Sequence, residues 1–250
     1  MDLTPKQQTS EAIRQANAIL VVTGQRPSID QVTGVVALGM ILRKLGKKVT
    51  ALVSDKIPPS ITFLTDGQLD KSPEALRDFI IKLDLGRAEV DKLRYTMEGG
   101  KLNIHLTPFR GKFSSGDVSF DYGEPAAAGD HQYDLVVALG VPSRLKLDKV
   151  LEDSSLGSVP LLNLDFHRIN ENYGAVNLIE PTASSLSEML VSLSESLQSG
   201  LIDEPIATVL LAGIVASTDR FTATHTTPKA LTVAAQLMAA GGKQQQVIKA

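Results

Sequence analysis

Side chains that could bind a phosphate group lie after predicted strands and at the ends of predicted helices in this chain. Guanidinium groups and the N-termini of helices bind phosphate without a metal ion. The candidates are Arg26, Ser28, Thr33, His167, Arg168, Ser184, Ser185, Ser217, Thr218 and Arg220. In the alternative arrangement, the arginines at 168 and 220 pair with carboxylates and close an empty cleft, the possible partners being Asp165, Asp219 and Glu188.

These side chains would be positioned by strands that alternate with helices. Residues 9–18 and 32–45 have the apolar spacing of helices, the second ended by Gly46, and the apolar runs 18–22 and 48–53 are typical of buried strands. A strand, helix, strand unit pairs its strands in parallel, and ligands bind beyond their carboxyl ends. The loop at 23–33 therefore lies in a functional position.

The segment from 79 to 122 has the alternating pattern of antiparallel strands. Two alternating runs flank Gly99-Gly100, which is a hairpin signal, and a further strand is predicted at 113–120. A short linker at 126–130 leads back to the main sheet. We expect an antiparallel insertion at about 79–128 that forms a sheet edge or a dimerisation ribbon. The expected assembly is a homodimer.

The strand and helix pattern resumes after residue 132. Strands are predicted at 133–139 and 159–164, with a helix at 145–156 between them. Helices are then predicted at 184–197, 204–217 and 228–240, the first with Ser184 or Ser185 as its capping residue. His225, which precedes the last helix, could face the cleft, but a role in a capping loop is expected. The fold class is α/β.

Four short segments stand out, at residues 24–34, 133–140, 165–167 and 213–221. In their order and spacing, over roughly residues 15–241, they resemble the motifs of the DHH phosphoesterases. That family uses these motifs to hold two divalent cations. The cations activate a hydroxide and bind the phosphate oxygens. Most positions that the family fills with metal ligands carry other residues in this chain, and a one-residue shift of the first motif leaves fewer matches. The replacements are Gly24, Ser28, Gly140, Phe166 and Ser217, whereas Asp30 is kept.

The third motif is the most informative, because Asp165-Phe166-His167 stands where the family has Asp-His-His. The resemblance implies that the first histidine is a metal ligand and that the second contacts the substrate phosphate. Phenylalanine cannot bind a metal, so Phe166 removes a ligand while His167 keeps a phosphate contact. In the fourth motif, Ser217 replaces an aspartate, and Asp219 lies two positions later.

The resemblance implies a parallel-sheet, three-layer DHH domain over residues 1–250, without the C-terminal substrate-binding domain of the family. It further implies a catalytically degenerate protein that needs no cofactor and binds a nucleotide, oligonucleotide or other phosphate ligand, or acts as a scaffold. The alternative is an active phosphodiesterase or phosphatase with a rebuilt site for one Mn²⁺ or Mg²⁺ ion. Its metal ligands would be Asp30, Asp165 and Asp219, with Asp165 and His167 as catalytic residues. Asp30 could hold a single magnesium ion through water, but we expect it to be an exposed, solvated carboxylate.

Composition excludes several other classes. A net charge of −3 gives no general attraction for nucleic acid, and the absence of cysteine excludes disulfides and thiolate metal sites. The N-terminus has no basic region followed by an apolar run, and the longest apolar stretch, 206–216, is too short to span a bilayer. We expect a cytoplasmic protein without a membrane partner, whose ligand is a phosphate-containing small molecule or a short nucleic acid.

Overall fold

The computed structural model describes residues 3–53, 55–70, 79–86, 88–122, 133–147, 156 and 159–248. Two compact units divide the chain: Met1–Ala75 with Ala128–Ala250, and Leu76–Ala127. The predicted linker at 126–130 and most of the predicted helix at 145–156 lie outside the described residues, and Arg144–Leu147 forms a short 3-10 helix, η4. None of the described helices is both long and apolar enough to cross a membrane.

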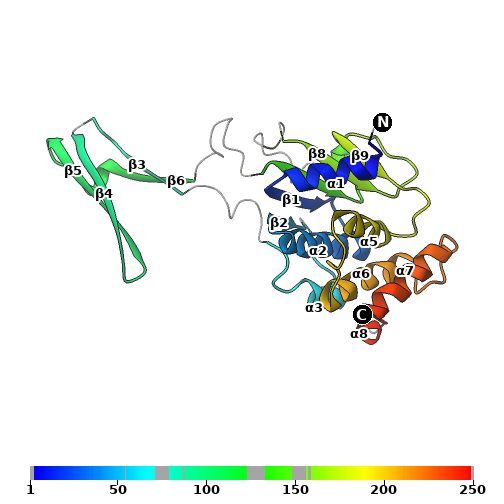
Figure 1. The fold of residues 1–250 in the computed structure, drawn as a ribbon. Helices are drawn as coiled ribbons and strands as arrows, with labels where there is room; N and C mark the ends of the chain where they lie inside the picture. The colour runs from blue at the N-terminus through cyan, green and yellow to red at the C-terminus, as the bar shows by residue number, and fades with distance from the viewer. Residues whose placement is uncertain are drawn as a thin grey trace. The chain divides into compact units, whose positions relative to one another are not determined.

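The first unit is built on a five-stranded parallel sheet (Figure 1). Its strands lie in the order β2-β1-β7-β8-β9, and every neighbouring pair is parallel. They are β1 (Ala18–Thr23), β2 (Lys48–Leu52), β7 (Leu135–Leu139), β8 (Leu161–Asp165) and β9 (Val176–Ile179). The first four were predicted from their apolar runs, and the α/β fold class is confirmed.

The central strands are buried on both faces, as their continuous apolar runs indicated. Alternate residues of a strand point to opposite faces of a sheet. Ile19 and Val21 of β1 therefore lie in a core formed with the helices, whereas Leu20 and Val22 lie in a second core on the other face. The second core includes Leu147 of η4.

Helices α1 (Pro5–Gln15), α2 (Ile29–Lys44) and α5 (Leu186–Leu197) cover one face of the sheet. Figure 1 shows α6 (Glu204–Ser217) and α7 (Pro228–Ala239) further from the sheet, and α6 packs on α2 and α5. The unit also contains η1 (Pro59–Ile61), α3 (Thr62–Thr65) and α8 (Gln244–Ile248). Helix α2 begins three residues earlier than predicted because Ser28 and Gln31 form a capping box. Helix α1 begins early for the same reason, with Thr4 as its cap, and ends at Gln15 rather than at residue 18.

The second unit contains two antiparallel ribbons. Strand β3 (Phe79–Leu83) pairs with β6 (Val118–Tyr122), and β4 (Glu89–Glu98) pairs with β5 (Lys101–Arg110). Gly99 and Gly100 both have positive φ, as a two-residue hairpin turn requires, so the predicted hairpin is confirmed. The strand expected at 113–120 is shorter, since Ser115–Asp117 form the 3-10 helix η3.

Candidate functional site

Three loops meet at one edge of the parallel sheet. Strand β1 pairs with β2 on one side and with β7 on the other, so the order of the strands reverses between β1 and β7. In open parallel sheets, ligands bind outside the carboxyl ends of the strands at such a point. Residues 24–28, 140–143 and 166–170 follow the carboxyl ends of β1, β7 and β8 here.

A cavity of about 440 Å³ lies between these loops and the helices. Its walls come from the first turn of α2, the loop after β8, the last residues of α6 and the loop before α7. The lining residues are Ser28, Ile29, Asp30, Gln31, Phe166, His167, Ala216, Ser217 and His225. The structure therefore brings together four of the predicted ligand residues, which are Ser28, Asp30, His167 and Ser217. Phe166 and His225 line the same cavity, so His225 does face it, as the sequence allowed.

Asp165 is buried at the end of β8, and His167 lies directly against it. Nδ1 of His167 is 2.6 Å from Oδ1 of Asp165, and Asn170 donates a hydrogen bond of 2.6 Å to Oδ2. Burial would raise the pKa of Asp165, but the hydrogen bonds from His167 and Asn170 outweigh burial and hold that pKa below its ordinary value. The hydrogen bond to Asp165 raises the pKa of His167, although partial burial and the nearby charge of Lys146 oppose the rise. Both side chains are therefore favoured in their charged forms.

Phe166 lies in the wall of the same cavity. Its ring stacks on the ring of His167, with centroids 5.0 Å apart and planes inclined by 23°. It is half-buried and also packs against the helical core. An apolar ring thus occupies the wall beside the imidazole.

Asp30 is buried and bonded to the start of α5. Its Oδ2 accepts a hydrogen bond of 2.7 Å from the amide of Leu186, and its Oδ1 accepts bonds from the amide and the hydroxyl of Ser187. Burial raises the pKa of Asp30 to about 6, although these hydrogen bonds lower it in part. The expectation of an exposed, solvated Asp30 is therefore wrong, because this carboxylate binds the free amides of a helix N-terminus.

Gly140 occupies the position at which the DHH resemblance places a bridging aspartate. Its φ is +67°, a conformation that residues with a Cβ rarely adopt. A Cβ at this position would lie 2.8 Å from Cγ of Gln31, whose amide donates a hydrogen bond to the carbonyl oxygen of Gly140. Gln31 therefore fills the space that an added side chain would need.

Most of the predicted hydroxyl ligands are already engaged within the fold. Thr33 and Thr218 donate to carbonyl oxygens of their own helices, and Ser185 caps α5. Ser184 joins α5 to the loop before α7 through Thr227 and the carbonyl of His225. Ser28 caps α2 but remains exposed, and Ser217 donates to the carbonyl of Ser184 at the cavity wall. Only the hydroxyls of Ser28 and Ser217 therefore line the cavity.

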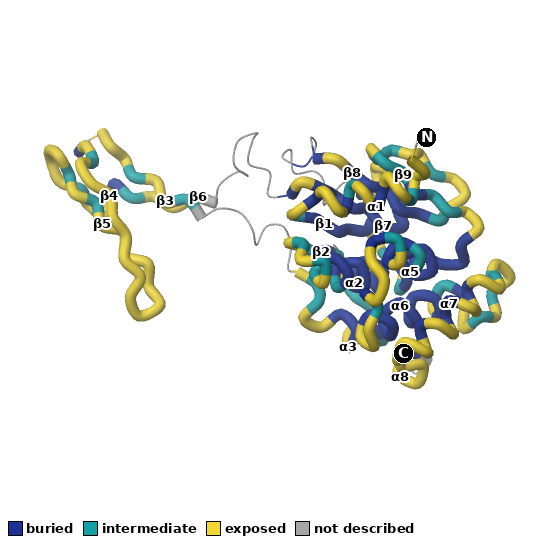
Figure 2. Tube along the Cα trace, in the orientation of Figure 1, coloured by how far each residue is buried: buried dark blue, intermediate teal, exposed yellow. Residues whose placement is uncertain are grey.

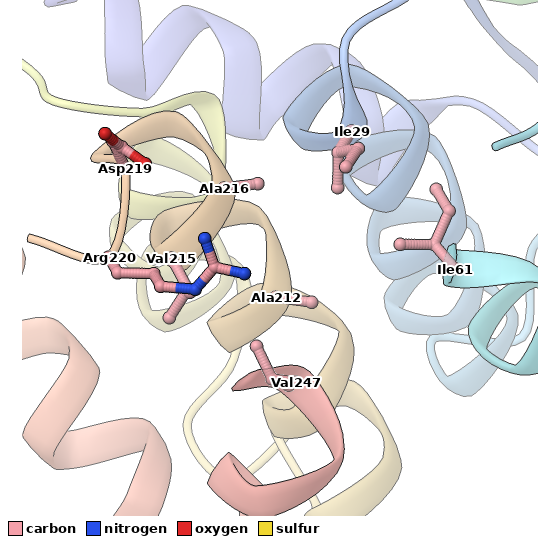
Figure 3. Close-up of a pocket in the computed structure, with 8 residues that line it drawn as sticks. All are labelled: Ile29, Ile61, Ala212, Val215, Ala216, Asp219, Arg220 and Val247. Atoms are coloured by element: carbon pink, nitrogen blue, oxygen red, sulfur yellow. The ribbon is translucent and has the colours of Figure 1, made fainter. Parts of the chain in front are cut away.

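The three predicted arginines do not line it. Arg26 and Arg168 are exposed on the loops after β1 and β8. Arg220 lies with Asp219 at an adjoining hollow of about 190 Å³ that shares Ile29 and Ala216 with the cavity (Figure 3). Among the described residues, neither Arg168 nor Arg220 takes part in an ion pair, unlike in the closed-cleft alternative. Glu188 pairs instead with Lys229 at 3.2 Å, and Asp165 with His167.

Sequence reasoning missed three residues that shape the site. They are Gln31, Asn170 and Lys229. The capping box of α2 could have placed Gln31 near the loops, because it lies three residues after Ser28. Asn170 donates a hydrogen bond to the buried Asp165, and Lys229 pairs with Glu188 of a different helix. A local sequence pattern does not reveal such partners.

The residues present do not fit the metal centre that the resemblance implies. Among the described residues, no three histidine, aspartate or glutamate side chains gather in an arrangement that could hold a metal ion. Asp165 and Asp30 are each engaged by several hydrogen-bond donors, and Asp219 lies at the adjoining hollow. The rebuilt one-metal site is thus not assembled in this structure.

Comparison with curated proteins finds partial sequence similarity. A bifunctional oligoribonuclease and PAP phosphatase NrnA of Thermus thermophilus is 33% identical over 96 residues, which is 37% of this chain and 29% of that protein. A probable bifunctional oligoribonuclease and PAP phosphatase NrnA of Streptococcus mutans is 29% identical over 109 residues, which is 44% of this chain and 34% of that protein. The matches thus span about a third of these relatives. No protein-family model matches the chain.

Solved structures share the fold at low sequence identity. An exopolyphosphatase-related protein from Bacteroides fragilis superposes with a TM-score of 0.71 and 13% identity, covering 98% of this chain and 59% of that one. A putative family II inorganic pyrophosphatase from Methanococcus jannaschii gives a TM-score of 0.51 and 12% identity, covering 91% and 58%.

The fold and the sequence similarity together support a relationship to the DHH-type phosphoesterase superfamily.

Proposed function

We propose that this chain is a catalytically degenerate DHH phosphoesterase-like protein that binds a phosphate-containing ligand in the 440 Å³ cavity. The observation that carries the proposal is at Gly140, where the backbone has positive φ and Gln31 occupies the space that a metal-bridging carboxylate would need. The cavity nevertheless persists, and hydroxyl and imidazole groups line it.

Anion binding would rest on the first turn of α2 and on His167. Helix α2 is 16 residues long and begins at the cavity, so its N-terminus carries partial positive charge toward a ligand. Nδ1 of His167 is engaged by Asp165, which leaves Nε2 as the donor for a phosphate oxygen. Ser28 and Ser217 would add hydroxyl contacts at the two sides of the cavity.

A ligand with more than one anionic group could also reach the arginines. Arg26 and Arg168 are exposed on neighbouring loops, and within the described residues neither forms an ion pair. Arg220 lies at the adjoining hollow. The curated relatives are named as oligoribonucleases and PAP phosphatases, which supports a nucleotide or short oligonucleotide as the ligand.

The organisation of the chain belongs to the same proposal. We propose one DHH-like domain over residues 1–250, interrupted by the β-rich insertion at about 79–128, and a homodimer in a cytoplasmic setting. A scaffolding role without a ligand is the second candidate, and it is favoured by the engagement of Ser184, Ser185, Thr33 and Thr218 within the fold.

Calorimetric titration tests the ligand. Mononucleotides, cyclic dinucleotides, short oligonucleotides and inorganic phosphate would be titrated into wild-type protein, into His167→Gln and into His105→Gln. His105 lies in the second unit and serves as the matched control. We expect binding of at least one phosphate compound that His167→Gln weakens about tenfold or more, because a hydrogen bond to a charged group contributes about 1.5–3 kcal/mol. Absence of binding by every compound would leave the scaffold role.

Turnover tests the enzymatic alternative. An aryl phosphodiester and an aryl phosphomonoester would be assayed with Mn²⁺, Mg²⁺ and without metal. We expect no turnover above that of Asp165→Asn under any condition. Manganese-dependent turnover that Asp165→Asn abolishes would replace the proposal with the one-metal phosphoesterase.

A further inference from the structure

The β4–β5 ribbon has one apolar and one polar face. Side chains alternate across a strand, so residues two apart and their cross-strand partners share a face. The pairs on one face are Leu93 with Leu106, Tyr95 with Ile104, and Met97 with Leu102. The pairs on the other face include Arg94 with His105, Thr96 with Asn103, and Glu98 with Lys101. These six residues thus form three successive hydrophobic pairs with no charged side chain among them.

Nothing within the described part of the second unit covers this face. Five of its six side chains are exposed by between 42% and 78%, and Figure 2 shows the ribbon as largely exposed. None of the described residues of this unit belongs to either hydrophobic core of the protein. A two-stranded ribbon without a packed face is only marginally stable in water. A stable ribbon therefore requires another surface packed against its apolar face.

The size of the face fits a contact between two proteins. From their exposed fractions, its side chains present roughly 600 Å² of surface, which is at the upper end of the patches found on monomers. Two such faces in contact would bury about 1,200 Å², the lower limit of a specific and stable interface.

We propose that the apolar face of the β4–β5 ribbon binds the same face of a second copy of this chain. Two-fold symmetry makes an interface self-complementary, so one surface contacts its own copy. With the two hairpin turns at the same end, β4 lies over β5 of the second copy, and the large Tyr95 ring meets the smaller Ile104. The other two pairs meet as leucine on leucine and methionine on leucine, and no charge is buried without a partner.

Sedimentation equilibrium of the full chain over a wide concentration range tests the proposal. Wild-type protein should have twice the mass of one chain. Tyr95→Lys places a charge in the centre of the face and should weaken dimerisation on the order of 100-fold. Thr96→Lys, one residue along on the polar face, is the matched control and should remain a dimer. Ile104→Thr keeps the β-branched shape, so weaker dimerisation in that variant would not reflect a lost strand.

Three outcomes would overturn the proposal. A wild-type monomer at all concentrations would mean that another surface or another protein covers the face. Equal weakening by Tyr95→Lys and Thr96→Lys would mean that the ribbon itself is lost. Unchanged dimerisation in both Tyr95→Lys and Ile104→Thr would place the interface elsewhere. Because the sedimentation experiment contains no phosphate ligand, its outcome tests the dimer independently of the proposed ligand binding.

Discussion

At the scale of single residues, Asp30 is a carboxylate that supports the fold from the wall of a candidate ligand site. It accepts three hydrogen bonds from the first turn of α5 while it lines the cavity. Its neighbour Gln31 caps α2 and also contacts the loop after β7. A ligand at the cavity would therefore act on the residues that join α2, α5 and the sheet.

We predict that Asp30→Asn lowers the free energy of unfolding at pH 7 by about 1–3 kcal/mol, because the new amide group places an N–H against an amide donor of Leu186 or Ser187.

The stability of the wild type should also depend on pH through Asp30. Burial raises the pKa of Asp30 from 3.8 to about 6, so the folded state binds the proton more tightly than the unfolded state. The associated stability is present below pH 3.8 and is lost as the pH rises through about 6.

Urea unfolding of wild type and variant at several pH values between 4 and 7 measures both effects, with the exposed Asp66→Asn as control. We expect the pH dependence in this window to flatten only in Asp30→Asn. An unchanged slope in that variant would mean that Asp30 does not titrate there.

A second prediction concerns the pair of His167 and Asp165. Asp165 has a pKa below 3.8, so its stabilising effect is lost as the pH falls through its folded pKa. His167 has a pKa above 6.5, so its effect is lost as the pH rises through its folded pKa. Both contributions are complete only between pH 3.8 and 6.5. NMR titration should find the pKa of His167 above its ordinary value in wild type and lower in Asp165→Asn. The same pKa in both proteins would show that the pair does not form.

At the scale of secondary-structure elements, α2, α5 and α6 approach one another closely at Gly213. A Cβ there would lie 2.0 Å from Oγ of Ser187 and 2.6 Å from both Oδ1 of Asp30 and Oγ1 of Thr33. Such distances are far below van der Waals contact, so the helices would have to move apart. The close approach keeps Asp30 in place against the start of α5.

We predict that Gly213→Ala destabilises the protein by about 1–3 kcal/mol, the range for overpacked cores, as measured by thermal or urea unfolding. Gly39→Ala in α2 is the matched control, since its Cβ would meet Ala51 at 3.2 Å and alanine favours a helix by about 1 kcal/mol. The control should change stability little. Equal stability of the two variants would argue against the close contact.

The turn after β7 gives a fourth prediction. Gly140→Asp should destabilise the protein by about 1–2 kcal/mol through its positive φ alone, and further through contact with Gln31. Adding Gln31→Ala to Gly140→Asp should remove the clash between the two side chains but not the cost of the positive φ.

Differential scanning fluorimetry should show no rise in the melting temperature of Gly140→Asp when Mn²⁺ is added. A manganese-dependent rise would mean that the cavity can still accept a metal.

The sequence was a good guide to elements and a weaker guide to side-chain partners. Continuous apolar runs predicted β1, β2, β7 and β8, because burial on both faces leaves a clear pattern. Strand β9 was missed, since only Leu178 of Val176–Ile179 is buried. At the site, motif spacing indicated Ser28, Asp30, His167 and Ser217, but Asp30 proved to be engaged between α2 and α5. Such contacts depend on helix packing, which a linear pattern does not contain.

At the scale of the whole molecule, the two units differ in how they are stabilised. The unit with the parallel sheet contains both hydrophobic cores, whereas the described residues of Leu76–Ala127 contribute to neither. Local stability follows the density of buried apolar contacts. The two units should therefore open independently.

We predict that backbone amides in β1, β7 and β8 exchange most slowly with deuterium at every protein concentration. Amides in β4 and β5 should exchange faster, and faster still on dilution, because dissociation of the proposed dimer uncovers the ribbon. Mass-spectrometric hydrogen exchange at two concentrations checks this. Exchange in β4 and β5 that is independent of concentration would contradict the dimer.

The contact between Gln31 and Gly140 also bears on ancestry. On the proposed function, a descendant that regained a bridging aspartate at 140 would first lose stability, since Gln31 and the left-handed backbone both oppose it. Several substitutions would have to arise together before selection could favour any of them. Hydrolysis, once lost, would then be difficult to regain. Related proteins should therefore differ more often in the ligand that they bind than in whether they cleave it.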